Sequence, residues 1–126
     1  MFQILIVDDN APFRQSLREI LCEQFPTMGV LEAEDGEDAL GKTESLPPHL
    51  VFMDIKLPGQ NGLEVTRTIK ARHPGIRVVI LTSYDLPEYR EAANQYGADY
   101  FLSKGSSSRE EILALVESIV GELMEP

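Results

Sequence analysis

Short apolar runs recur along the chain and alternate with longer stretches in which apolar residues lie three or four positions apart. Consecutive apolar positions with many β-branched side chains are typical of strands that are buried on both faces. Five such runs cover residues 4–7, 29–31, 50–53, 78–81 and 100–102. Because parallel strands need helical crossovers between them, the alternation predicts an α/β domain with a parallel sheet and helices on both of its faces.

Capping residues indicate where the helices begin and end. Short polar side chains that suit helix N-terminal caps open three helical stretches: Asn10 before 12–25, Asp35 before 37–45, and Asn61 at the start of a stretch that runs to 73. The fourth helix is predicted over 88–96, with Gly97 as its stop. Ser107 and Glu110 form a capping-box pattern before the apolar stripe of the fifth helix.

Length and composition fit one globular domain. The 126 residues leave no room for two ordinary domains, so residues 1–126 are expected to form a single domain with its core over about 3–123. The single cysteine, Cys22, cannot form a disulfide within the chain, which indicates a reducing, cytoplasmic location. It lies next to the apolar stripe of the first helix and is expected to be a small buried hydrophobic residue.

The net charge argues against two kinds of partner. The chain carries 11 basic and 21 acidic residues, a net charge of −10, and this field repels phosphate backbones and anionic lipid surfaces. No apolar run approaches the length that spans a bilayer. We therefore expect neither nucleic acid nor a membrane to be a partner of this chain.

Polar residues that carry chemistry follow four of the predicted strands. They are Asp8 and Asp9 after the first strand, Asp54 after the third, Thr82 after the fourth and Lys104 after the fifth. Ligands of parallel α/β sheets bind beyond the carboxyl ends of the strands. Each residue alone has an ordinary explanation as a turn, cap, strand-end or surface residue. Their joint placement predicts one site.

The residue types at this site indicate phosphoryl chemistry with a divalent cation. Three carboxylates close together repel one another unless a cation is present, and an all-oxygen ligand set with open positions suits Mg²⁺. Asp54 is then a candidate nucleophile that forms an aspartyl phosphate. Lys104 and the Thr82 hydroxyl could neutralise the phosphoryl oxygens, where the charge of the transition state resides.

At these residues the sequence resembles the receiver domain of two-component response regulators, over about residues 3–123. The motifs that carry the resemblance are Asp8-Asp9, Asp54 with Pro58 and Gly62, Thr82-Ser83, and Gly97-Ala98-Asp99-Tyr100-Phe101-Leu102-Ser103-Lys104. The resemblance implies a flavodoxin-like, doubly wound (βα)₅ fold with a five-stranded parallel sheet of order 2-1-3-4-5. It also implies a phosphoacceptor signalling domain that assists its own phosphorylation and dephosphorylation rather than a true enzyme.

The resemblance further implies a role for each site residue. Asp54 would accept a phosphoryl group from a histidine kinase or a histidine phosphotransfer protein. Magnesium would be bound by Asp9, by Asp8 largely through water, by Asp54, and by the backbone carbonyl of Lys56. Lys104 would be the lysine that completes the family pattern.

Signal output is also implied by the resemblance. Thr82 would be the switch hydroxyl, and Phe101 the aromatic that turns inward as Thr82 moves. The face formed by the fourth helix, fifth strand and fifth helix would then contact an output protein or a C-terminal effector domain. The chain would be a stand-alone regulator or the N-terminal part of a transcriptional regulator. Leu115, off the main stripe of the fifth helix, weakly indicates a docking surface or a homodimer formed on phosphorylation.

Three features at four positions set this chain apart within the family pattern. Gly105 follows Lys104 where many receivers have proline, so the loop to the fifth helix can turn without a cis-proline. Phe101 replaces the commoner tyrosine and cannot donate a hydroxyl hydrogen bond. Lys56 and Tyr84 occupy the variable positions that look out over the phosphate, and we hypothesise that the bulk of Tyr84 slows dephosphorylation.

Other functions fit the residues less well. Magnesium-dependent phosphatases with a nucleophilic aspartate place it after the first strand with a second acid two residues on, whereas Asp8 is followed by Asp9 and Asn10. A nucleotide-binding turn is disfavoured because residues 8–12 contain no glycine. A pseudo-receiver that works without phosphate is disfavoured by the complete set of acids and Lys104. His49 and His73 are interpreted as loop or cap residues.

Overall fold

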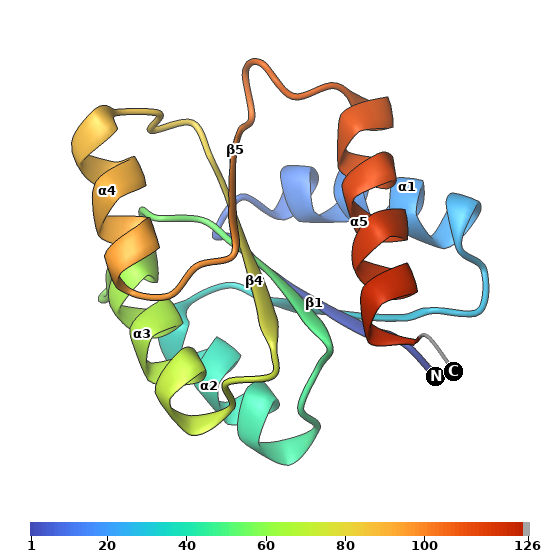
Figure 1. Cartoon of the computed structure of the whole chain (residues 1–126), viewed down its shortest axis with the longest axis horizontal. Coiled ribbons are helices and arrows are strands. Elements are labelled where there is room, and N and C mark those ends of the chain that lie inside the picture. Colours follow the sequence, from blue (N-terminus) through green and yellow to red (C-terminus); the bar gives the residue numbers. More distant parts are fainter. Residues whose placement is uncertain (125–126) are drawn as a thin grey trace.

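A parallel five-stranded sheet forms the centre of the molecule (Figure 1). Its strands lie in the order β2-β1-β3-β4-β5. The computed structural model describes residues 1–124. The strands are β1 (Gln3–Val7), β2 (Gly29–Ala33), β3 (Leu50–Met53), β4 (Arg77–Thr82) and β5 (Tyr100–Ser103). The helices are α1 (Ala11–Gln24), α2 (Gly36–Ser45), α3 (Gly62–Arg72), α4 (Pro87–Gln95) and α5 (Arg109–Leu123). The predicted fold class and strand order are confirmed.

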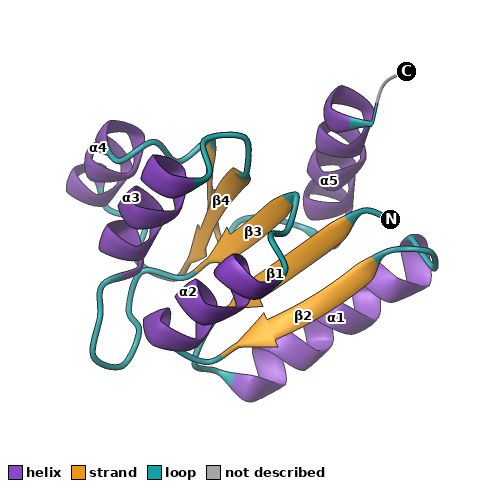
Figure 2. Cartoon of the chain, turned by 90° about the horizontal axis from the view of Figure 1, so that it is seen from below, coloured by secondary structure: helices purple, strands orange, loops and turns teal. Residues whose placement is uncertain are grey.

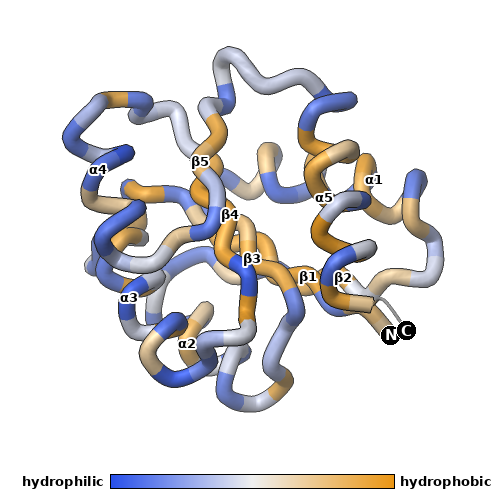
Figure 3. The backbone as a smooth tube through the Cα atoms, viewed as in Figure 1, coloured by the Kyte–Doolittle hydropathy of each residue, from blue (hydrophilic) through white to orange (hydrophobic). Residues whose placement is uncertain are grey.

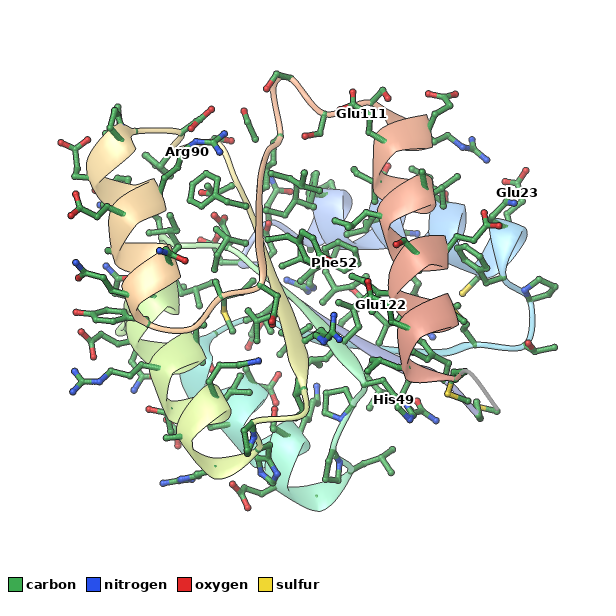
Figure 4. All side chains as sticks on the ribbon, in the orientation of Figure 1. Glu23, His49, Phe52, Arg90, Glu111 and Glu122 are labelled. Carbon is green, nitrogen blue, oxygen red and sulfur yellow. The ribbon has the colours of Figure 1, made fainter. Side chains whose placement is uncertain are left out.

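The helices cover the two faces of the sheet in unequal numbers, two on one face and three on the other (Figure 2). Successive strand residues point to opposite faces, so Ile4 and Ile6 pack with α1 and α5, while Leu5 and Val7 pack with α2, α3 and α4. Phe52 is fully buried in the α1–α5 layer (Figure 4). Figure 3 shows the strands as the most hydrophobic part of the backbone.

Three of the predicted helix caps are present. The side-chain oxygens of Asn10, Asp35 and Asn61 accept hydrogen bonds from the first turns of α1, α2 and α3. The fourth helix ends one residue earlier than expected, with Tyr96 as its cap and Gly97 in the left-handed conformation at φ 94°. These contacts satisfy backbone groups that helix ends otherwise leave unpaired.

The capping box of the fifth helix lies one residue beyond the predicted position. Ser108 accepts from the amide of Glu111, and the Glu111 carboxylate accepts from the amide of Ser108. Both Ser107–Glu110 and Ser108–Glu111 fit the capping-box pattern. The turn after β5 decides between them, because the Ser107 amide is already bonded to the carbonyl of Ser103.

The prediction that Cys22 is buried is wrong, because its side chain is exposed. Helix α1 turns Leu17 and Leu21 into the core, and Cys22 lies about 100° around the helix from Leu21. Leu115 lies on α5, is half-buried and packs against the core cluster that α1 and α5 share. Residues 125 and 126, which close the predicted domain, lie outside the described residues.

The two histidines have structural roles. The His49 ring stacks on Phe2 at 4.8 Å between centroids, and its Nδ1 accepts a hydrogen bond from the amide of Gln3. His73 caps α3 and lies 3.3 Å from a carboxylate oxygen of Glu44. These contacts agree with the loop and cap interpretation.

Strand register brings the loops after β1, β3, β4 and β5 to one edge of the sheet. Val7 pairs with Met53, and Met53 with Ile80. Backbone bonds continue the sheet beyond the strands, from the Asp54 amide to the Val7 carbonyl and from the Lys104 amide to the Thr82 carbonyl. Among residues 1–124 no helix is long and apolar enough to cross a membrane.

Candidate functional site

Asp8, Asp9 and Asp54 gather at the carboxyl edge of the sheet. One carboxylate oxygen from each lies within 4.8 Å of the others. Asp8 and Asp54 are buried, whereas Asp9 is exposed. An all-oxygen cluster with one side open to solvent matches the ligand preference of Mg²⁺, which keeps several of its waters. The convergence expected from the strand ends is present, and a magnesium ion fits the donor set.

Lys104 is the cation that the structure places within this acidic cluster. Its Nζ lies 2.6 Å from Asp8 Oδ2 and 3.4 Å from Asp54 Oδ2. The same ammonium lies 4.0 Å from the centroid of the Phe13 ring, on α1, a distance at which cation–π attraction is effective. Lys104 is therefore held between two carboxylates and one aromatic face.

Backbone amides orient the two buried carboxylates. Asp8 Oδ1 accepts a hydrogen bond from the amide of Asn10 at 2.9 Å, and Asp54 Oδ1 accepts one from the amide of Ile55 at 2.8 Å. Burial raises the pKa of Asp8, and the negative charge of Asp54 adds to this rise; the bonds from Lys104 and Asn10 oppose it. The cluster thus favours any ligand that adds positive charge.

Gly62 allows the loop after β3 to close over Asp54. A Cβ atom at Gly62 would lie 1.8 Å from the backbone oxygen of Asp54. The amide of Gly62 donates to the carbonyl of Ile55, and Lys56 forms an antiparallel bridge with Asn61. The N-terminus of α3 therefore packs directly against the backbone that carries Asp54, which explains the glycine in the sequence motif.

Thr82 and Phe101 lie on neighbouring strands but in different surroundings. Thr82 is fully buried, and its hydroxyl accepts a hydrogen bond from the amide of Tyr84 at 3.2 Å. Phe101 is half-buried beneath α4, with the Arg90 guanidinium 4.6 Å from its ring centroid. Arg90 forms two hydrogen bonds to Asp85 and projects from α4 (Figure 4). Phe101 does not belong to the acidic cluster.

Lys56 and Tyr84 meet beside the cluster. Lys56 Nζ lies 5.4 Å from the ring centroids of both Tyr84 and Tyr89. This contact joins the loop after β3 to the loop after β4. Tyr84 is 43% exposed.

Two residues at the site were not expected from the sequence. Phe13 contacts Lys104, and Arg14 donates a hydrogen bond to the carbonyl of Asp8. In the sequence, Phe13 is one of the apolar residues at helical spacing in the first helix, and Arg14 belongs to no motif. Both are brought to the site by the orientation of α1 across the sheet. The one available signal was their position in the first turns of the helix that follows Asp8 and Asp9.

Known proteins with this arrangement are response regulators. Response regulator GacA of Pseudomonas protegens is 36% identical over 115 residues, which cover 91% of this chain and 54% of GacA. Chemotaxis protein CheY of Halobacterium salinarum is 38% identical over 102 residues, covering 81% of this chain and 83% of CheY. The chain thus spans about half the length of the GacA relative and most of the CheY relative.

Structural similarity gives the same result. A crystal structure of a CheY-like response regulator receiver domain protein from Methanospirillum hungatei JF-1 matches with a TM-score of 0.89 at 28% identity, covering 97% of this chain and 95% of that one. The family model described as the response regulator receiver domain matches residues 4–117. The chain therefore belongs to the receiver domain family of two-component response regulators, whose members are phosphorylation-activated switches.

Proposed function

We propose that this chain accepts a phosphoryl group on Asp54 from a phosphohistidine of a histidine kinase or histidine phosphotransfer protein. The observation that carries the proposal is the position of Asp54, which lies buried among Asp8, Asp9 and Lys104 at the carboxyl edge of the sheet. A carboxylate at hydrogen-bonding distance from an ammonium, beside an acidic metal-ligand set, is placed for phosphoryl transfer.

The transfer exchanges one bond to phosphorus for another. A carboxylate oxygen of Asp54 forms a bond to phosphorus while the bond between phosphorus and the donor's imidazole nitrogen breaks. The electron pair of the broken bond stays with that nitrogen. Lys104 Nζ is near enough to Asp54 Oδ2 to pair with a phosphoryl oxygen in the product. The hydrogen bond from the Ile55 amide to Oδ1 favours Oδ2 as the attacking oxygen.

Magnesium is the cofactor that the donor set fits. Asp8, Asp9, Asp54 and the backbone carbonyl of Lys56 would hold it, with Asp8 acting largely through water. When bound, it neutralises charge on the phosphoryl oxygens. Lys104 already compensates part of the acidic charge through its 2.6 Å contact with Asp8. Lys104 and a bound metal ion would therefore both interact with the Asp8 carboxylate.

Signal output then passes through Thr82 and Phe101. A phosphoryl group on Asp54 would draw the Thr82 hydroxyl toward it and away from the Tyr84 amide that it now binds. Movement of Thr82 would make room for Phe101 and change the α4–β5–α5 face, which contacts an output protein, an effector domain or a second copy of the chain. The phosphoryl group shifts the populations of the two conformations, before and after Thr82 moves, by the difference in how strongly each conformation interacts with it.

Intact-mass measurement tests the phosphoacceptor directly. The wild-type protein, incubated with Mg²⁺ and acetyl phosphate, should gain the mass of one phosphoryl group, and the gain should disappear when EDTA removes the metal. Asp54→Asn should gain none. Asp38→Asn, which changes a half-exposed carboxylate on α2, is the matched control and should behave like wild type.

Three results would contradict the proposal. Incorporation into Asp54→Asn, or none into wild type, would exclude Asp54 as the acceptor. Repeated turnover of an added phosphomonoester would instead support a magnesium-dependent phosphatase.

A further inference from the structure

Arg14 connects the loop that carries Asp8 and Asp9 to the edge strand β2. Its Nη1 donates to the backbone carbonyl of Asp8, and its Nε donates to Glu32 Oε1 at 3.0 Å. The Arg14 side chain is only 14% exposed. One guanidinium therefore spans two segments of the chain that are adjacent in the sheet but separated by helix α1.

Glu32 is a firmly held anchor for this contact. Burial raises the pKa of Glu32, but hydrogen bonds from Arg18 and Arg14 lower it by more. The Glu32 carboxylate is therefore charged at neutral pH. The Glu32 backbone carbonyl also accepts a hydrogen bond from Lys42. Arg18 shares the Glu32 carboxylate at 3.1 Å but is 46% exposed, and within residues 1–124 its side chain hydrogen-bonds to Glu32 and not to the Asp8 carbonyl.

We propose that Arg14 is a positioning residue for the metal and phosphoryl site, an inference that rests on the proposed function. The backbone of Asp8 is fixed at both ends, by its amide bonding to the Ala33 carbonyl and by its carbonyl bonding to Arg14. This geometry sets the direction in which the chain leaves β1. It thereby aims the carboxylates of Asp8 and Asp9 at Asp54.

The chemistry of arginine suits this role and lysine does not. A guanidinium presents several N–H donors in a rigid plane and can hold two acceptors at fixed angles. A lysine ammonium on a flexible chain can approach either the Glu32 carboxylate or the Asp8 carbonyl, without the same control of both. Because Glu32 neutralises the charge of Arg14, the effect on the acidic cluster is geometric rather than a supply of positive charge.

Magnesium titration separates positioning from charge, because the two effects have opposite signs. Removing a cation near an acidic cluster strengthens Mg²⁺ binding if charge alone matters. Loss of positioning weakens it, by about tenfold for outer contacts that orient metal ligands. Calorimetric titration of the metal alone into the purified chain should therefore show weaker binding for Arg14→Met, which keeps an unbranched side chain but removes the guanidinium, and for Arg14→Lys, which keeps the charge.

Arg18→Met is the matched control. It removes the other arginine from Glu32 without touching the Asp8 carbonyl, and its Mg²⁺ affinity should stay within about twofold of wild type. All proteins are compared at a temperature at which melting curves show them folded. In the metal-free protein, the amide NMR signals of Asp8, Asp9 and Asn10 should shift in Arg14→Met and remain in place in Arg18→Met. Should Arg14→Met fail to fold, Arg14→Lys carries the test.

Three outcomes distinguish the claims. Unchanged or tighter Mg²⁺ binding in folded Arg14→Met, or in Arg14→Lys when that variant carries the test, would overturn the positioning role while leaving the proposed function intact. Equal weakening in Arg18→Met would overturn it as well, since the effect would then come from Glu32 and not from the Asp8 carbonyl. Absence of Mg²⁺ binding in the wild type would overturn the metal part of the proposed function and, with it, this inference.

Discussion

Asp8 shows how a single buried carboxylate can oppose folding and still serve the site. Burial, together with repulsion from Asp54, raises its pKa despite hydrogen bonds from Lys104 and Asn10. The folded protein therefore binds a proton at Asp8 more tightly than the unfolded chain does. Between the ordinary aspartate pKa, about 4, and the raised value, stability falls as pH rises.

Substitution of Asp8 by asparagine removes this penalty. The metal-free Asp8→Asn protein should be more stable than wild type at pH 7, and its advantage should shrink as pH falls toward about 4, because the wild-type carboxyl then becomes protonated. Urea denaturation at several pH values with EDTA checks this. Asp38→Asn, at a half-exposed position, should show no such advantage. An advantage of Asp8→Asn that grows on acidification would contradict the account.

Tyr84 governs access to the phosphoryl group if its ring shields Asp54 from water. Lys56 Nζ lies 5.4 Å from the centroid of its ring, which favours a fixed position of the ring beside Lys56. Tyr84→Ala should therefore shorten the lifetime of the phosphorylated protein several-fold, as measured by loss of the phosphoryl mass after removal of acetyl phosphate. Leu86→Ala, at a similarly exposed position in the same loop, is the control. An unchanged lifetime in Tyr84→Ala would remove the shielding hypothesis.

At the scale of elements, the junction between β3 and α3 depends on having glycine, which has no side chain, at position 62. Because a Cβ at Gly62 would lie 1.8 Å from the Asp54 carbonyl oxygen, Gly62→Ala has to push α3 away from the backbone that carries the acceptor. We expect it to destabilise the protein by about 2 kcal/mol, a typical cost of strain in a packed core, and to slow phosphorylation.

Gly41 offers a matched control on another helix. A Cβ there meets nothing within 4 Å, so Gly41→Ala should stabilise the protein by about 0.5–1 kcal/mol through helix propensity. Denaturant midpoints of the two variants measure both effects. If Gly62→Ala were as stable as wild type, the close approach of α3 to Asp54 would not be required.

At the scale of the whole molecule, the switch has to carry a local change at Asp54 to the face of α4 and β5. Thr82 is the connecting group that we propose, since it is fully buried at the end of β4 and its hydroxyl accepts a hydrogen bond from the Tyr84 amide. Beryllofluoride with Mg²⁺, a mimic of the phosphoryl group, should shift the amide NMR signals of α4 and β5. Thr82→Ala should keep the shifts at Asp54 and Ile55 but lose those at Phe101. Equal shifts at Phe101 in both proteins would contradict this route.

Much of this molecule follows from its sequence because the signals are local and repeated. Apolar runs identify buried strands, and once the strands are parallel, Asp8, Asp54 and Lys104 have to meet at one edge. Details that depend on the packing of one element on another could not be predicted from the sequence. The turn after β5 moved the capping box to Ser108, and the rotation of α1 exposed Cys22 and brought Phe13 and Arg14 to the site.

The central claim is that Asp54 alone carries the phosphoryl group, and chemical trapping tests it most directly. Protein treated with Mg²⁺ and acetyl phosphate is reduced with borohydride, which converts an aspartyl phosphate to homoserine, and is then sequenced by tandem mass spectrometry. The account predicts homoserine at position 54 and aspartate at positions 8 and 9. Homoserine at either of those two positions, or an unmodified Asp54 in protein that has gained the phosphoryl mass, would contradict it.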